Sequence, residues 1–93
     1  NPAAYAASKG GLLQLTRWMS TTLAPTIRVN AISPGGIYRN QPSSFVDKYI
    51  EKTPMKRMGK EEDLIGAIIY LATDMSGWVT GQNIIVDGGW STW

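Results

Sequence analysis

Two short strand-like segments, separated by helical patterns, constrain the fold of this chain more than any other feature. Residues 27–33 alternate in the manner of a strand, and residues 83–86 form a second short apolar strand. Between them we expect a short helix from about 43 to 51 and a longer one over 61–73. This order is typical of a crossover between parallel strands, so we predict an α/β fold.

A third helix is predicted before the first strand, over residues 3–23, with Pro25 ending it. Its expected apolar stripe follows three- and four-residue steps and comprises Leu12, Leu15, Thr16, Met19 and Leu23. The helix over 61–73 is apolar around most of its circumference, so we expect it to be buried on more than one side. Two strands cannot bury both helices, which indicates that the sheet continues elsewhere.

Pro34-Gly35-Gly36 should end the first strand. The segment from there to the second long helix has weaker periodicity. Ser43 or Ser44 is the expected cap of the short helix, and Thr53-Pro54 should end it. Residues 38–58 are interrupted by Pro42 and Pro54 and follow a glycine turn.

Composition excludes several classes of protein. The 93 residues contain no cysteine and no histidine, which excludes a disulfide framework, a thiol nucleophile, a histidine-based triad and a typical zinc site, so no metal site is predicted. The net charge of +2 is too small to indicate a nucleic-acid partner. The longest uncharged apolar stretch, residues 64–72, is too short to span a bilayer, and we expect a cytoplasmic protein without a membrane partner. The chain begins at Asn1 rather than Met, which indicates a piece of something longer.

Tyr5 and Lys9 form the pattern with the clearest chemical meaning. Their four-residue spacing places both side chains on one face of the first helix, one turn apart. An ammonium beside a phenol favours the phenolate and lowers the tyrosine pKa from its reference of about 10. Such a tyrosine can act as a general acid or base. The spacing alone favours an ordinary exposed pair, because a tyrosine and a lysine four residues apart on a helix often occur by chance, and the rest of the chain has to decide.

Four motifs in order resemble the C-terminal portion of a short-chain dehydrogenase/reductase. They are YAASKGG at residues 5–11, IRVNAISPGG at 27–36, KRMG at 56–59 leading into EED at 61–63, and VTGQ at 79–82 followed by VDGGW at 86–90. The resemblance covers the whole chain, and it implies part of a doubly wound parallel Rossmann-type sheet, incomplete by itself. Residues 1–93 would then be the C-terminal fragment of one dehydrogenase domain, without the dinucleotide-binding half.

The resemblance also implies roles for individual residues. Tyr5 would be the proton donor or acceptor, and Lys9 would lower its pKa and bind the nicotinamide ribose. The loop that lines the nicotinamide of NAD or NADP would comprise Pro34, Gly35, Gly36 and Ile37. Glycine there is consistent with a close approach of backbone to ligand, although without the resemblance a plain turn that ends the strand is the favoured explanation. Residues 38–58 follow this loop directly and have weak periodicity, so we expect them to form a substrate lid.

The sequence departs from the family pattern in two places. Arg39 stands where the family usually has a threonine that contacts the nicotinamide. A guanidinium suits an anionic substrate, but an exposed loop arginine is an equally good interpretation. The glycine-rich phosphate loop and the catalytic serine belong upstream in the family and are absent here; Ser8 is not that serine.

We therefore expect an NAD(P)-dependent oxidoreductase that reduces a carbonyl or oxidises an alcohol, acts on a small molecule and forms a dimer or tetramer. A weaker resemblance, in residues 39–42 and the tail GGWSTW, is to reductases of bacterial sugar-acid and flagellin-glycosylation pathways. The 93 residues alone should be inactive. The alternative is a catalytically silent fragment that acts only in subunit association, for which four tryptophans supply contact area.

Overall fold

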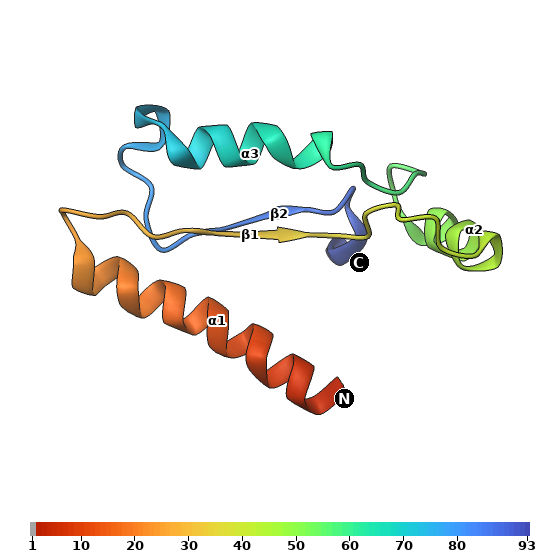
Figure 1. Cartoon of the computed structure of the whole chain (residues 1–93), viewed down its shortest axis with the longest axis horizontal. Helices are drawn as coiled ribbons and strands as arrows, with labels where there is room; N and C mark the ends of the chain where they lie inside the picture. The colour runs from red at the N-terminus through yellow and green to blue at the C-terminus, as the bar shows by residue number, and fades with distance from the viewer. Residues whose placement is uncertain (1) are drawn as a thin grey trace. The chain divides into compact units, whose positions relative to one another are not determined.

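The computed structural model describes residues 2–93; Asn1, on which the expectation of a longer chain rests, lies outside the described residues. Helix α1 (Pro2–Leu23) is followed by strand β1 (Ala31–Pro34), helices α2 (Ser43–Lys52) and α3 (Glu62–Ala72), and strand β2 (Asn83–Val86), as Figure 1 shows. Single 3₁₀ turns, η1 (Asp74–Ser76) and η2 (Trp90–Thr92), flank β2. The predicted order of helix, strand, short helix, helix and strand is confirmed.

The chain divides into two compact units. One comprises the residues up to Ala31 together with Tyr70–Ile84, and the other comprises Ile32–Ile69 together with Ile85–Trp93. Each strand and α3 contribute residues to both units.

The two strands pair in parallel, as predicted. Ala31 N–H donates to the Gln82 carbonyl at 2.8 Å, and Gly35 N–H donates to the Val86 carbonyl at 2.9 Å. Both partners advance by the same number of residues in the same direction, which defines a parallel ladder. In the part of the chain that the structure describes, the sheet consists of β1 and β2.

The first strand is shorter than the alternating pattern predicts, since it begins at Ala31 rather than at residue 27. Before Ala31, one backbone bond remains, from Gly81 N–H to the Val29 carbonyl at 2.8 Å, and side-chain bonds accompany it. Val29 N–H donates to Thr80 Oγ1 at 3.0 Å, and Asn30 bonds the Val79 carbonyl and Gln82 N–H at 2.9 and 3.0 Å. Side-chain groups of this kind compete with regular backbone pairing, which accounts for the difference.

Arg28 holds the connection after α3. Its guanidinium donates to Ser76 Oγ at 2.7 Å and to the carbonyls of Leu71, Thr73 and Val79 at 3.2 to 3.3 Å. The Leu71 carbonyl lies in the last turn of α3 and Thr73 follows that helix, so a positive charge meets the negative end of the helix dipole there. Ser76 is almost completely buried. Arg28 therefore fixes the path of residues 71–79.

Helix α1 begins one residue earlier than predicted, and its predicted apolar stripe is confirmed only in part. Thr16 of the stripe is buried together with Ser20, and Met19 and Leu23 are partly buried, whereas Leu12 and Leu15 are about half exposed. The reason is close packing within the first unit. A Cβ added to Gly81, whose φ is +71°, would lie 2.7 Å from Ser20 Oγ, so only small side chains fit on this face of the helix.

Helix α3 is less buried than predicted. None of its residues is buried, and Ile65, Ile68 and Ile69 are about half exposed. A chain of 93 residues has too little apolar surface to cover a helix that is apolar around most of its circumference. Neither α3 nor any other described helix combines the length and apolar character required to cross a membrane.

Helix α2 forms and ends as expected, but its predicted cap is wrong. Pro42 occupies the N-cap position, and its carbonyl accepts hydrogen bonds from Phe45 and Val46 N–H at 3.0 and 3.1 Å. Ser43 is already helical, so no hydroxyl serves as a cap. The extended, almost fully buried Thr53 then ends the helix before Pro54.

We expect Arg28→Leu to reduce the free energy of unfolding by at least about 2 kcal/mol, because hydrogen bonds to a charged group contribute roughly 1.5–3 kcal/mol. Denaturant titration would measure the loss. Arg17→Leu, at an exposed position on α1, is the matched control and should change the free energy of unfolding by about 0.5 kcal/mol at most. Equal losses in the two variants would contradict this role of Arg28.

Candidate functional site

Tyr5 and Lys9 contact each other on α1, as the spacing predicts. The Lys9 ammonium lies 5.5 Å from the centroid of the Tyr5 ring, a separation typical of a cation–π contact. Tyr5 is 65% exposed, and Lys9 is exposed as well. A phenol and an ammonium are thus held together on an accessible surface. Their catalytic roles stay predictions.

Ser8 serves the helix itself. Its hydroxyl donates to the Tyr5 carbonyl at 2.8 Å, three residues back along α1. Such local bonds are common for serine within helices.

The loop after β1 is held on both sides by hydrogen bonds of its second glycine. Gly36 N–H donates to the phenol oxygen of Tyr49 at 2.6 Å, and the Gly36 carbonyl accepts from Gly59 N–H at 2.9 Å. Tyr38 N–H in turn donates to the Gly59 carbonyl at 2.9 Å, which makes a parallel bridge between Ile37 and Gly59. The loop is therefore a fixed part of the second unit, and both backbone groups of Gly36 are used within the protein.

Glycine is required at both positions because protein atoms approach the backbone closely. A Cβ at Gly35 would lie 2.6 Å from Asp87 Cβ, and a Cβ at Gly36 would lie 2.5 Å from the Tyr49 ring. Neither distance is compatible with a side chain. The two glycines are thus explained by packing before any ligand is considered.

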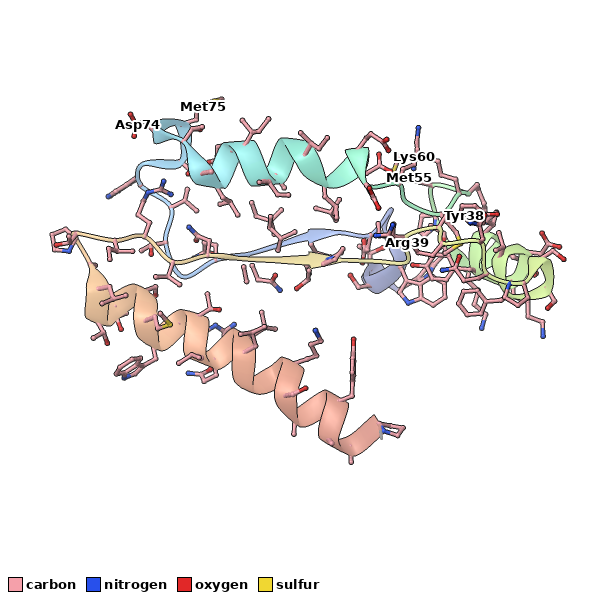
Figure 2. All side chains as sticks on the ribbon, in the orientation of Figure 1. Tyr38, Arg39, Met55, Lys60, Asp74 and Met75 are labelled. Carbon is pink, nitrogen blue, oxygen red and sulfur yellow. The ribbon has the colours of Figure 1, made fainter. Side chains whose placement is uncertain are left out.

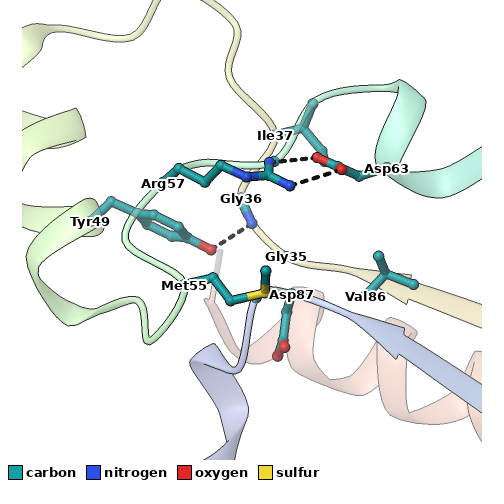
Figure 3. A pocket seen from close by; sticks show the side chains of 11 residues that line it. Gly35, Gly36, Ile37, Tyr49, Met55, Arg57, Asp63, Val86 and Asp87 are labelled. Atoms are coloured by element: carbon teal, nitrogen blue, oxygen red, sulfur yellow. Dashed lines mark hydrogen bonds and ion pairs between the residues drawn. The ribbon is translucent and has the colours of Figure 1, made fainter.

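A cavity of about 190 Å³ lies beside this loop (Figure 3). Its wall combines the glycine turns that follow β1 and β2 with side chains of α2, of the start of α3 and of the segment between them. The lining residues are Gly35, Gly36, Ile37, Tyr49, Met55, Arg57, Gly59, Asp63, Val86, Asp87 and Gly88. Ligands of open α/β sheets bind outside the carboxyl ends of strands, which is where these residues lie.

Arg57 and Asp63 form a bidentate ion pair in the cavity wall, with Nη1–Oδ2 at 2.7 Å and Nη2–Oδ1 at 2.9 Å (Figure 3). Lys60 N–H also donates to Asp63 Oδ2, at 2.8 Å. The hydrogen bonds from the Arg57 side chain and the Lys60 backbone hold the pKa of Asp63 well below its ordinary value of 3.8. The bond to Asp63 likewise raises the pKa of Arg57. The pair fixes the connection from α2 to α3.

Asp87 organises the C-terminal turn. Its carboxylate accepts hydrogen bonds from Gly89 N–H at 2.9 Å and Ser91 N–H at 3.0 Å. A hydrogen bond from the Ser91 side chain, opposed by partial desolvation and supported by these backbone bonds, lowers the pKa of Asp87. Asp87 thereby anchors η2.

Arg39, which Figure 2 labels, lies in the segment between β1 and α2. It is not one of the residues that line the cavity, and its side chain is ion-paired with Glu61. Both side chains are 66% exposed. The substrate role predicted for Arg39 stays a prediction, and the structure adds Glu61 as a competitor for its charge.

The structure thus brings the predicted site residues together in two groups, Tyr5 with Lys9 in one compact unit and Pro34 to Ile37 in the other. Sequence reasoning missed Tyr49, Arg57 and Asp63. The sequence motifs that contain Arg57 and Asp63 were recognised, but the ion pair between these two residues was not predicted. Tyr49 had one usable signal, because two consecutive glycines after a strand imply that something packs closely on them.

A sequence model of the family described as enoyl-(acyl carrier protein) reductase matches residues 1–91. A short-chain dehydrogenase from Leptospira borgpetersenii, solved with bound NAD⁺, is 48% identical with a TM-score of 0.90, over 94% of this chain and 35% of that one. The chain belongs to the short-chain dehydrogenase/reductase family. The Rossmann-type α/β fold inferred from its motifs is confirmed with it.

Two further relatives show the range of the family. Post-translational flagellin modification protein A of Campylobacter coli is 40% identical over 87 residues, which are 92% of this chain and 34% of the relative. A gluconate 5-dehydrogenase from Burkholderia cenocepacia, solved in complex with NADP and tartrate, is 34% identical with a TM-score of 0.90, over 96% of this chain and 38% of that one. The chain therefore spans about a third of the length of the relatives it matches.

Asp63 should make the stability of the fold depend on pH. Because its pKa is lowered in the folded chain, its contribution to the free energy of unfolding is complete above pH 3.8, the ordinary pKa, and is lost as the pH falls through the folded pKa. We expect Asp63→Asn to lower the melting temperature at neutral pH, and we expect its difference from wild type to shrink progressively as the pH falls below about 3.8. Melting curves across this range, with Asp47→Asn on α2 as an exposed control, would measure it. A difference that stays constant with pH would contradict the assignment.

Proposed function

We propose that this chain carries the proton-transfer residues of an NAD(P)-dependent oxidoreductase that interconverts a carbonyl and an alcohol. The observation that supports this most directly is the contact of Tyr5 with Lys9 on an exposed face of α1, in a chain of this family. An exposed pair of this kind is available to a ligand.

Tyr5 supplies the proton in this proposal. A nicotinamide held by Lys9 and residues 34–37 would supply the hydride for the carbonyl carbon, or would accept it in the oxidative direction. The Tyr5 phenol gives its proton to the carbonyl oxygen as the carbon–oxygen double bond becomes a single bond, and solvent then returns a proton to the phenolate. Lys9 stabilises the phenolate by its charge and is exposed for hydrogen bonding to ribose hydroxyls.

The loop from Pro34 to Ile37 would line the nicotinamide. The relatives solved with NAD⁺ and with NADP support a nicotinamide cofactor for this chain. Since the N–H and the carbonyl of Gly36 are both hydrogen-bonded within the protein, this glycine would contact the cofactor by van der Waals packing and not by hydrogen bonds. The family's phosphate loop and the residue that selects NAD or NADP lie upstream of the segments matched here.

We further propose that residues 1–93 are the C-terminal part of one Rossmann-type domain. Coverage of about a third of each relative supports this, as do the half-exposed apolar side chains of α1 and α3, which upstream strands and helices would cover. Without a phosphate loop the 93 residues alone should be inactive. The names of the relatives favour this enzyme over a silent association module, and a homo-oligomer would use exposed aromatic side chains such as Trp78 and Trp93.

A hydroxylated, anionic small molecule is the substrate class that the relatives support. The gluconate 5-dehydrogenase and the flagellin modification protein agree with the sugar-acid and flagellin resemblance of the sequence. Arg39 is the candidate reader of the anion, because a guanidinium binds carboxylate or phosphate well.

Tyr5→Phe keeps the aromatic ring but removes the proton, so we expect kcat of the complete enzyme to fall at least about 10²-fold. Lys9→Ala should also be severely impaired. Tyr70→Phe, on α3, is the matched control and should keep wild-type turnover. The measurement is carbonyl-dependent oxidation of NADH and NADPH; near-normal turnover by Tyr5→Phe would refute the proposed chemistry.

Arg39 and Glu61 allow a paired test of anion recognition. Arg39→Ala should raise KM for a charged substrate about tenfold and leave KM for a neutral analogue unchanged. Glu61→Gln removes the competing carboxylate and should lower KM for the charged substrate. Steady-state kinetics with both substrates decide the matter, since equal effects on the two would return Arg39 to the status of an exposed loop residue.

A further inference from the structure

Tyr49 links three segments of the second unit. It lies on α2, its phenol oxygen accepts the Gly36 N–H at 2.6 Å, and its ring stacks on Trp90 of η2 with centroids 4.4 Å apart and planes 7° apart. Phe45, one turn earlier on α2, extends the stack at 6.1 Å. Figure 3 shows the phenol directed at the Gly36 backbone from the wall of the cavity. One side chain therefore couples α2, the loop after β1 and the C-terminal turn.

Gly36 is clamped by this contact. Its missing Cβ leaves room for Tyr49 ring atoms, which would lie 2.5 to 2.8 Å from a Cβ there, and its carbonyl is fixed from the other side by Gly59. The orientation of this peptide thus depends on the phenol and on Gly59. A shift of Tyr49 would move the stretch of backbone proposed to line the nicotinamide.

Trp90 supports Tyr49 from behind. The turn that carries Trp90 is anchored by the Asp87 carboxylate, which accepts from Gly89 and Ser91 N–H. Trp90 N–H itself donates to the Asp87 carbonyl at 3.2 Å. The ring of Tyr49 is therefore stacked on a tryptophan whose backbone is fixed by hydrogen bonds.

We propose that Tyr49 is a positioning residue for the cofactor loop. Its hydroxyl holds the Gly36 peptide in the conformation that binds the nicotinamide, and Trp90 supports its ring. Because Tyr49 lies on α2, within the predicted lid, it also couples any movement of α2 on ligand binding to the loop. This inference rests on the proposed function, because it assumes that residues 34–37 contact the cofactor. A merely structural tyrosine would affect stability without affecting cofactor affinity.

The test compares Tyr49→Phe, which keeps the ring and its stacking but loses the hydroxyl, with Tyr70→Phe in the complete enzyme. Three properties are measured for each variant. They are the cofactor dissociation constants from NADH and NADPH fluorescence, kcat and the KM for the cofactor at saturating substrate, and amide exchange at Gly36 by NMR. We expect Tyr49→Phe to speed exchange at Gly36 and to weaken cofactor binding about tenfold, with kcat at saturating cofactor changed less than about twofold. Tyr70→Phe should match wild type in all three.

Trp90→Leu keeps the phenol and removes its support, and it should weaken cofactor binding in the same direction with a smaller change. An unchanged dissociation constant in Tyr49→Phe, with faster exchange at Gly36, would overturn the positioning role and leave the proposed function intact. A wild-type enzyme that binds neither NADH nor NADPH would overturn the proposed function and this inference with it.

Discussion

The parallel pairing of β1 with β2 is the constraint on which the candidate site depends. The last bond of the ladder, from Gly35 N–H to the Val86 carbonyl, carries the pairing past the end of β1 and brings two glycine turns together. Gly35 then lies so close to Asp87 that a Cβ at position 35 would be 2.6 Å from Asp87 Cβ. The cavity wall, the anchored C-terminal turn and the place of Trp90 all follow from that one register.

Hydrogen bonds and ion pairs fix many of the positions that apolar packing fixes in larger domains. The described core contains a single buried apolar residue, Met58, while Thr16, Ser20, Thr53 and Ser76 are buried among hydrogen bonds. Arg28 and the Arg57–Asp63 pair hold the connections on either side of α3. Such bonds fix geometry well, but each adds little net stability, so a chain with this core depends on further apolar cover.

The chemistry proposed for the protein is divided between the two units. The first provides Tyr5 and Lys9, an exposed phenol and ammonium in contact, and the second provides a rigid loop next to a cavity. A helix gives proton-transfer groups a fixed spacing, whereas a loop clamped by Tyr49 and Gly59 gives a ligand a fixed surface. The function proposed for this member of the short-chain dehydrogenase/reductase family draws on both features.

Much of the local structure was predictable from the sequence by itself. The helix bounds followed from apolar periodicity and prolines, the position of β2 from a short apolar run between turns, and the Tyr5–Lys9 contact from helical spacing, since all of these depend on neighbours along the chain. The four motifs likewise identified the family. Only the tertiary structure decided the burial of Ser20 on α1, the start of β1 and the partner of Gly36. Each depends on residues far away in sequence: Gly81 against Ser20, Thr80 and Gln82 beside Val29 and Asn30, and Tyr49 on the loop. No periodic pattern records which distant backbone will approach a given side chain, so these contacts could not be predicted.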